Sequence, residues 1–211
     1  MKKCLLFDSD GTLVDSEFLN NQALAAELQV SGITETAQEL VSNYRGWMFS
    51  AVLDDIQARH DIVLDTGFTG RFRHRASLHF ESNLRAISHI PEVLAELNAP
   101  MCVASNAPMA KIKQAMNITG LEKFFGDSIY SAYEINSWKP EPDLFLHAAK
   151  AMRHQPEQCI VIEDSDVGVS AALAAGIDVV RYDPESRAQA SAGVMNINTM
   201  ADLPAALERF A

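Results

Sequence analysis

Short apolar runs separated by polar segments recur in the second half of the chain, and one more stands at its start. The clearest runs, each followed by small or acidic residues, are 3–7, 101–105, 159–163 and 177–181. Runs of this length, bounded by turn-forming residues, are typical of strands buried on both faces. A weaker run predicts a further strand near residues 128–132.

Helical patterns lie between these runs. Apolar residues at helical spacing predict helices near residues 108–116, 141–153, 166–175 and 203–210. Strands that alternate with helices are typical of a parallel sheet covered by helices on both faces. The fold class that we predict is therefore α/β, with a doubly wound, Rossmann-like parallel sheet.

Residues 16–85 follow another pattern. Apolar positions recur there at helical spacing, in residues 18–28, 48–58 and 68–84, and no run resembles the strands described above. This pattern predicts an all-helical insert that begins soon after the first strand. The expected division is an α/β core made of residues 1–15 and 86–211 and a helical domain made of residues 16–85.

The chain is acidic. Its 211 residues include 28 Asp and Glu against 17 Lys and Arg, which gives a net charge of −11. A charge of this sign argues against a nucleic acid or an anionic membrane surface as partner. It also means that a bound phosphate must be held by local positive charge or by a metal ion. No apolar stretch approaches the roughly 20 residues needed to cross a bilayer, and Asp8 and Asp10 cut the apolar start short, so we expect a cytoplasmic protein.

The three cysteines of the chain stand inside the apolar runs. Cys4, Cys102 and Cys159 have apolar neighbours and no paired spacing. A catalytic thiolate or a metal ligand would need polar neighbours. We therefore expect three reduced thiols buried in strands.

Two carboxylates follow the first predicted strand. Asp8 and Asp10 are separated by one residue, and side chains at this spacing project to the same side of an extended chain. In an open parallel sheet, ligands bind at the carboxyl ends of the strands. An isolated Asp-x-Asp is more often a helix cap or a solvated turn, but the other strand ends are polar as well.

Those other strand ends carry groups suited to phosphate and metal binding. The second strand leads into Ser105-Asn106, whose hydroxyl and backbone N–H groups can hold a phosphate oxygen. The run at 159–163 leads into the acidic pair Glu163-Asp164, which suits a divalent cation that prefers oxygen ligands, and Mg²⁺ fits best. Lys139 stands just before a predicted helix that two prolines introduce.

The charges of these residues indicate that they belong to one site. The four carboxylates of Asp8, Asp10, Glu163 and Asp164 cannot all ionise at close range without compensation, and a phosphate adds nearly two further negative charges. Mg²⁺ and Lys139 together supply three positive charges. This is the kind of neutralisation that a phosphoryl-transfer site needs.

Together, these residues resemble the motifs of a known family. The segments that match its four motifs in order are Asp8-Ser-Asp10-Gly-Thr12, Ser105-Asn106, Lys139-Pro140 and Glu163-Asp164-Ser165, and the family is the haloacid dehalogenase-like hydrolase superfamily. The stretch from Glu163 to Gly176 resembles the subgroup of sugar-phosphate phosphatases and phosphoglucomutases. The resemblance implies that the α/β part is the catalytic core and that residues 16–85 are a mobile helical cap domain.

The resemblance also implies a mechanism in two steps. Asp8 would attack phosphorus and form an aspartyl-phosphate, while Asp10 would protonate the leaving alcohol and later take a proton from the hydrolytic water. The carboxylates of Asp8 and Asp164 and the backbone carbonyl of Asp10 would ligate Mg²⁺. Glu163 would bind the metal directly or through a water molecule.

The remaining motif residues would bind the phosphoryl group. Family resemblance assigns the phosphoryl oxygens to the Ser105 hydroxyl and the Asn106 amide. Lys139 would offset the negative charge of both Asp8 and the phosphate.

Two classes of enzyme in the superfamily are excluded, because this chain does not match their characteristic residues. Dehalogenases lack the second aspartate of the first motif, whereas this chain has Asp10. Phosphonatases carry a Schiff-base lysine in the cap, and residues 16–85 contain no lysine.

Phosphomutases of the β-phosphoglucomutase type have a histidine at the position of Asn20, so hydrolysis is favoured and phosphoryl transfer stays an alternative. A catalytically silent regulator that binds a phosphorylated metabolite is a third possibility.

The substrate would be chosen by the helical domain. Arg45 and Gly46 occupy the place of the family's specificity loop, where an arginine can meet a second anionic group such as a sugar-acid carboxylate; a surface ion pair is the alternative for Arg45. Residues 99–106 and 138–140 look similar to bacterial 6-phosphogluconate phosphatases. We therefore expect a monomeric, Mg²⁺-dependent phosphatase that acts on a small phosphorylated metabolite, with 6-phosphogluconate as the first substrate to test.

Overall fold

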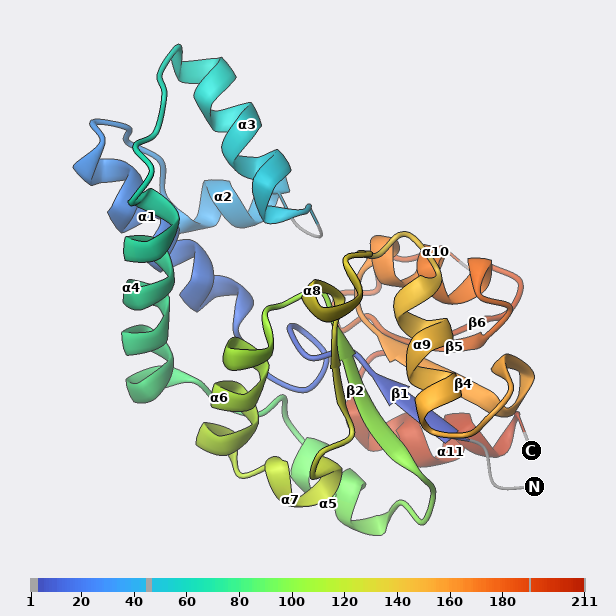
Figure 1. The fold of residues 1–211 in the computed structure, drawn as a ribbon. Helices are drawn as coiled ribbons and strands as arrows, with labels where there is room; N and C mark the ends of the chain where they lie inside the picture. Colours follow the sequence, from blue (N-terminus) through green and yellow to red (C-terminus); the bar gives the residue numbers. More distant parts are fainter. Residues whose placement is uncertain (1–3, 45–46, 190, 211) are drawn as a thin grey trace. The chain divides into compact units, whose positions relative to one another are not determined.

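A six-stranded sheet forms the framework of the larger part of the chain (Figure 1). The computed structural model describes residues 4–44, 47–189 and 191–210. The strands are β1 (Cys4–Phe7), β2 (Met101–Ser105), β3 (Ile129–Ser131), β4 (Cys159–Glu163), β5 (Asp178–Tyr182) and β6 (Val194–Ile197). They lie in the order β3-β2-β1-β4-β5-β6, and every neighbouring pair is parallel. The predicted parallel α/β sheet is confirmed.

The strand order reverses at β1. From this central strand the chain first builds the β2–β3 side of the sheet and then crosses to β4, β5 and β6 on the other side. The carboxyl ends of β1, β2 and β4 therefore lie side by side at the point where ligands bind in open α/β sheets. All four residues of β1 are buried, so the strand holds the segment that follows it in a fixed place.

Helices cover both faces of this sheet. Those of the sheet-containing part are α5 (Ile90–Glu96), α6 (Met109–Thr119), α7 (Glu122–Phe125), α8 (Ala132–Ile135), α9 (Asp143–Ala151), α10 (Asp166–Ala174) and α11 (Leu203–Glu208), with 3-10 turns at Pro156–Gln158 and Met200–Asp202. The helices α6, α9, α10 and α11 correspond to predicted ones. The sequence prediction missed α5, α7 and α8, which are too short to display a helical period, and it missed β6, whose residues are mostly half-buried.

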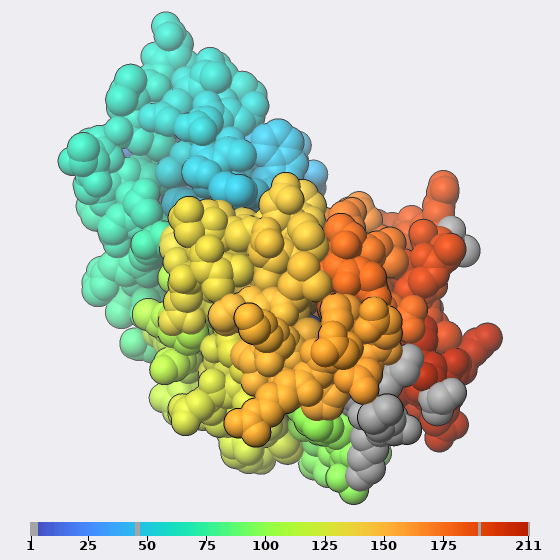
Figure 2. All heavy atoms as spheres, turned by 45° about the vertical axis from the view of Figure 1, so that its right-hand side comes forward, coloured from blue at the N-terminus to red at the C-terminus, as the bar shows by residue number. Residues whose placement is uncertain are grey.

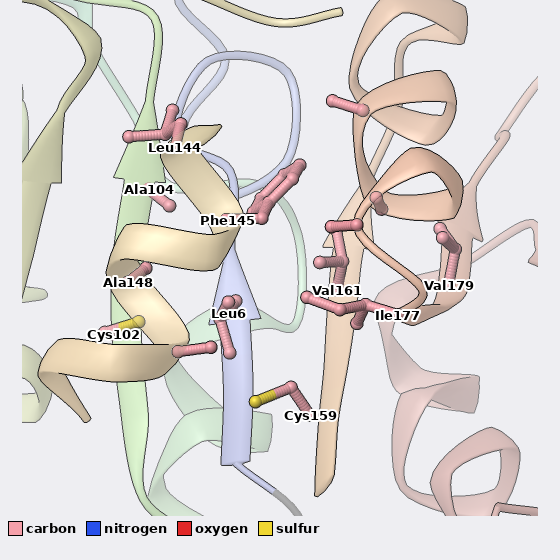
Figure 3. Packing of buried hydrophobic residues seen from close by; sticks show 14 of the residues in the cluster. Leu6, Cys102, Ala104, Leu144, Phe145, Ala148, Cys159, Val161, Ile177 and Val179 are labelled. Atoms are coloured by element: carbon pink, nitrogen blue, oxygen red, sulfur yellow. The ribbon is translucent and has the colours of Figure 1, made fainter. Parts of the chain in front are cut away.

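The main core lies between the sheet and the helices α9 and α10. Figure 3 shows Leu144, Phe145 and Ala148 of α9 pointing at β1 and β2, over Leu6 and Cys102. On the other face of β1, the Phe7 ring meets Phe125 of α7 edge to face, with 5.9 Å between centroids. Side chains alternate along a strand, and in β1 both sets are buried.

The segments around α9 and α10 form the outer surface on this side of the sheet. In Figure 2 the yellow to orange atoms of this region form much of the visible face. The cysteines Cys4, Cys102 and Cys159 are free thiols buried in β1, β2 and β4, as predicted.

The chain divides into two compact units. One consists of Met1–Asp15 and Arg85–Ala211, and the other of Ser16–Leu84. The second unit is helical throughout and contains α1 (Glu17–Val30), α2 (Ala37–Tyr44), α3 (Phe49–His60) and α4 (Phe68–Asn83). Its role as a cap over a catalytic site stays a prediction. No helix within the described residues is long and apolar enough to span a membrane.

The helical unit has its own core and a buried carboxylate. Leu28, Leu40 and Ile56 are fully buried in its apolar cluster. Glu27 of α1 is only 1% exposed, and its Oε1 accepts a hydrogen bond of 2.6 Å from Nε of Arg71 on α4. Nη2 of Arg75, one turn further along α4, lies 3.4 Å from Glu27 Oε2. These ion pairs join α1 to α4.

We expect Arg71→Met to lower the free energy of unfolding by about 1–3 kcal/mol, because it removes the shortest hydrogen bond of the buried Glu27 carboxylate. The two exposed Arg71–Asp65 hydrogen bonds that are lost with it should contribute about 0–1 kcal/mol of this value. The matched control is Arg73→Met, which removes the same charge from an exposed position of the same helix and should cost less than about 0.5 kcal/mol. Urea unfolding of the whole chain measures both values. Equal losses in the two variants would contradict the role of the Glu27–Arg71 pair.

Candidate active site

Three buried charged side chains meet at the carboxyl ends of β1 and β4. Nζ of Lys139 donates one hydrogen bond to Asp8 Oδ1 at 2.6 Å and another to Glu163 Oε1 at 2.9 Å. The side chains of Lys139, Asp8 and Glu163 are 3%, 10% and 1% exposed. Asp8 directly follows β1, and its backbone N–H continues the ladder to Ile162 of β4. The pairing of the two strands therefore places both carboxylates beside the same ammonium group.

The backbone of Lys139 is fixed by the second motif. Asn106, directly after β2, accepts a hydrogen bond from the Lys139 N–H through Oδ1 at 2.9 Å, and its Nδ2 donates to the Lys139 carbonyl at 3.3 Å. Ser105, the last residue of β2, is buried, and its Oγ accepts a hydrogen bond of 3.1 Å from the Ala107 N–H. The second and third motifs therefore form one hydrogen-bonded unit.

Burial and the attraction between opposite charges have opposite effects on the pKa values of Asp8 and Lys139. Burial raises the pKa of the Asp8 carboxyl, and the negative charges of Glu163 and Asp10 act in the same direction, whereas the Lys139 ammonium opposes them. Burial alone would lower the pKa of Lys139, but the attraction and hydrogen bonds of Asp8 and Glu163 outweigh it and raise that pKa. Lys139 therefore keeps its charge.

Glu163 is held from its other side by the start of α10. Its Oε2 accepts hydrogen bonds from the backbone N–H of Ser165 at 2.7 Å and from the Ser165 hydroxyl at 3.0 Å. The same hydroxyl accepts a bond from the Gly168 N–H and so caps α10. A Cβ on Gly168 would lie 1.7 Å from Glu163 Oε1, so only glycine leaves room for this carboxylate.

Asp164 lies against the loop that follows β1. Its Oδ1 accepts a hydrogen bond of 3.2 Å from the Thr12 hydroxyl. A Cβ on Gly11 would lie 2.5 Å from Asp164 Oδ2, and the φ of Gly11 is +83°, a value that favours glycine. The fourth-motif carboxylate therefore touches the backbone directly after Asp10.

Asp10 has a cationic partner that the sequence analysis missed. Nζ of Lys111, in the first turn of α6, donates to Asp10 Oδ2 at 2.8 Å. The two side chains are 26% and 29% exposed. The sequence does show a lysine in the first turn of the helix that follows the second motif. Because this lysine is 101 residues away from Asp10 along the chain, the sequence does not show that the two residues pair.

The predicted specificity residues belong to the helical unit. Asn20 is half-buried in the first turn of α1, and its part in substrate choice stays a prediction. Arg45 and Gly46 lie outside the described residues. Within the described ranges, no three Asp, Glu, His or Cys side chains converge on a single point as a metal cluster would.

Comparison with known proteins identifies the family. The sequence profile of haloacid dehalogenase-like hydrolases matches residues 2–176. The chain belongs to this family. Over 205 residues it is 33% identical to the 6-phosphogluconate phosphatase of Escherichia coli K12, which covers 96% of this chain and 93% of that protein. The resemblance drawn from the four motifs is confirmed.

Other haloacid dehalogenase-like hydrolases extend the comparison. The fructose-1-phosphate phosphatase of Escherichia coli K12 is 29% identical over 182 residues, which cover 83% of this chain and 94% of that protein. A solved haloacid dehalogenase-like protein of unknown function from Agrobacterium tumefaciens superimposes with a TM-score of 0.84 at 28% identity and 99% coverage of both chains. The chain is a phosphatase of this family, that is, a phosphoric monoester hydrolase.

We expect Gly168→Ala to lower kcat/KM for phosphate release by at least about 10-fold, because displacing a catalytic group by 1 Å can cost about 10²-fold. Overpacking should also destabilise the fold by about 1–3 kcal/mol. Gly70→Ala in α4 is the matched control, since its Cβ would meet nothing within 4 Å, and it should stabilise the chain by about 0.5–1 kcal/mol. Phosphate-release kinetics and urea unfolding test both variants; an active Gly168→Ala enzyme would contradict the packing argument.

Proposed function

We propose that the chain hydrolyses a small sugar phosphate or sugar-acid phosphate through an aspartyl-phosphate formed on Asp8. The observation that carries the proposal is the buried Lys139, which holds Asp8 and Glu163 at the carboxyl edge of the sheet. The matches to a 6-phosphogluconate phosphatase and a fructose-1-phosphate phosphatase support the substrate class. Of the two, 6-phosphogluconate is the substrate of first choice.

The first step transfers the phosphoryl group to Asp8. An oxygen of its carboxylate attacks phosphorus, the bond from phosphorus to the leaving-group oxygen breaks, and the carboxyl group of Asp10 gives its proton to that oxygen. The sugar leaves as an alcohol, and Asp10 is left as a carboxylate. The Asp8–Lys139 bond supports this role because it orients the Asp8 carboxylate and keeps a positive charge beside it.

The second step restores the enzyme. The Asp10 carboxylate takes a proton from a water molecule, whose oxygen attacks phosphorus and breaks the bond to Asp8. Inorganic phosphate leaves, Asp8 returns to a carboxylate, and Asp10 is protonated again for the next cycle. The partial exposure of the Asp10 side chain suits a group that must meet both leaving group and water.

The phosphoryl oxygens have donors at the end of β2. Ser105 accepts from the Ala107 N–H, so its own hydroxyl hydrogen is oriented away from that bond and can donate to a phosphoryl oxygen. The Asn106 side chain is engaged with Lys139, which assigns the phosphate contact to the Asn106 backbone N–H. Helix α6 begins at Met109, three residues later, and its N-terminus adds a favourable dipole.

We further propose that the same edge of the sheet holds a Mg²⁺ ion. Asp8 and Glu163 contact the Lys139 ammonium group and Asp10 contacts that of Lys111, while Asp164 lies against Thr12 and Gly11. Four carboxylates therefore outnumber two ammonium groups at this edge of the sheet. The carboxylates of Asp8 and Asp164 and the backbone carbonyl of Asp10 would hold the ion, since hard oxygen donors with added waters are what Mg²⁺ prefers. When bound, Mg²⁺ acts as a Lewis acid that offsets phosphoryl charge.

Glu163 supports the metal indirectly in this proposal. Its two oxygens already accept hydrogen bonds from Lys139 and Ser165. A direct metal bond would compete with these contacts, so a bridging water is the better arrangement. The helical unit would select the leaving group, with Asn20, Arg45 and Gly46 as the proposed specificity residues.

We expect Mg²⁺-dependent release of phosphate from 6-phosphogluconate, and loss of that release in EDTA. The panel contains hexose phosphates, glycerol phosphates, nucleotides and phosphoglycolate. Glucose 6-phosphate is the matched control for 6-phosphogluconate because it lacks the carboxylate. A flat profile would contradict the substrate choice alone, whereas conversion of β-glucose 1-phosphate to glucose 6-phosphate without phosphate release would favour the mutase.

We expect Asp8→Asn to abolish turnover, because the amide keeps the shape of the nucleophile and removes its charge. Asp10→Asn should lower kcat by about 10²–10⁴-fold, the usual loss for an acid–base group. Asp15→Asn, an exposed aspartate a few residues further along, is the matched control and should stay active. Steady-state kinetics measure all three; turnover by Asp8→Asn would refute its role as nucleophile.

A further inference from the structure

We propose that Lys111 is a positioning residue for Asp10, one that orients the Asp10 carboxylate for proton transfer. The inference rests on the proposed function, in which Asp10 serves as acid and base. It adds a residue that stands outside the four motifs of the family resemblance, on the helix α6.

The geometry of the pair supports an orienting role. Nζ of Lys111 lies 2.8 Å from Asp10 Oδ2, which restricts rotation of the carboxylate about its Cβ–Cγ bond. The backbone at Asp10 is also fixed, because the Gly11 N–H bonds to the Val14 carbonyl and Leu13 bonds back to Ser9. With the backbone held, Lys111 acts on the rotamer of the Asp10 carboxylate.

Local preference argues against a purely structural reason for this lysine. A cation in the first turn of a helix is unfavourable because the N-terminus carries partial positive charge. Both partners are about a quarter exposed, and an ion pair with this exposure adds about 0–1 kcal/mol to stability. The fold therefore gains little from Lys111, so its placement beside Asp10 points to the reaction.

The position of α6 also links the two halves of the site. The helix begins at Met109, directly after the loop of Ser105 and Asn106 that would bind the phosphoryl oxygens. Lys111 reaches from this helix to the loop after β1. The residue therefore sets the distance between the acid–base group and the phosphoryl-binding loop.

The role of Lys111 predicts a dependence on the leaving group. An alkyl phosphate needs a proton from Asp10 as its bond to phosphorus breaks, whereas an aryl phosphate such as p-nitrophenyl phosphate releases a stable anion. Lys111→Met should lower kcat/KM for the alkyl substrate by about 10–100-fold and for the aryl substrate by less than about 3-fold. The ratio of the two values is independent of how much of the variant is folded.

Three further variants complete the test. Lys111→Arg keeps the charge and should restore activity to within about 3-fold of the unmodified chain. Lys113→Met is the matched control, because Lys113 is exposed and lies on the same helix two positions away, and it should leave both substrates unaffected. In the Asp10→Asn background, Lys111→Met should have no further effect, since a residue that acts through another is non-additive with it.

The outcomes separate the inference from the proposed function. If Asp10→Asn loses activity while Lys111→Met keeps it, the role of Lys111 is refuted and the phosphatase mechanism stands. Additive losses in the double variant, or equal losses with alkyl and aryl substrates, refute it as well and indicate direct substrate binding by Lys111. Full activity in Asp10→Asn overturns both.

Discussion

The candidate site depends on one buried ammonium group between two buried carboxylates. Removing such charges from water costs several kcal/mol for each ion, and mutual attraction with good hydrogen bonds is what offsets that cost. Lys139, Asp8 and Glu163 meet this condition at 2.6 and 2.9 Å. Loss of Lys139 would leave both buried carboxylates without their shared cation, and the contact fixes the ends of β1 and β4 and the loop before α9 together.

The parallel sheet supplies the frame that this contact needs. Because β1 lies between β2 and β4, three strand ends deliver polar residues to the same edge. Two glycines then allow carboxylates to approach the backbone. Gly168 makes room for Glu163, and Gly11 makes room for Asp164. The two glycines therefore determine how closely these carboxylates approach the backbone.

The two lysines of the site work under different conditions. Lys139 is almost fully buried, where a charge pair interacts strongly because the surroundings screen it weakly. Lys111 and Asp10 are partly open to solvent, where attraction is weaker and a carboxylate can still exchange protons. Both environments suit the proposed mechanism, in which the buried Asp8 is the nucleophile and the partly exposed Asp10 is the acid–base group that the leaving group and water approach.

The sequence alone determined the α/β class, the main strands and the grouping of Asp8, Lys139 and Glu163, because buried strands leave continuous apolar runs and the motifs are short and local. It did not predict α2, the short helices α5, α7 and α8 or the strand β6, whose apolar signals are too short or too exposed. Tertiary structure alone decided that Glu27 pairs with Arg71 and that Lys111 pairs with Asp10. Such contacts join residues far apart along the chain, so their existence depends on the path of the folded backbone, which no local pattern records.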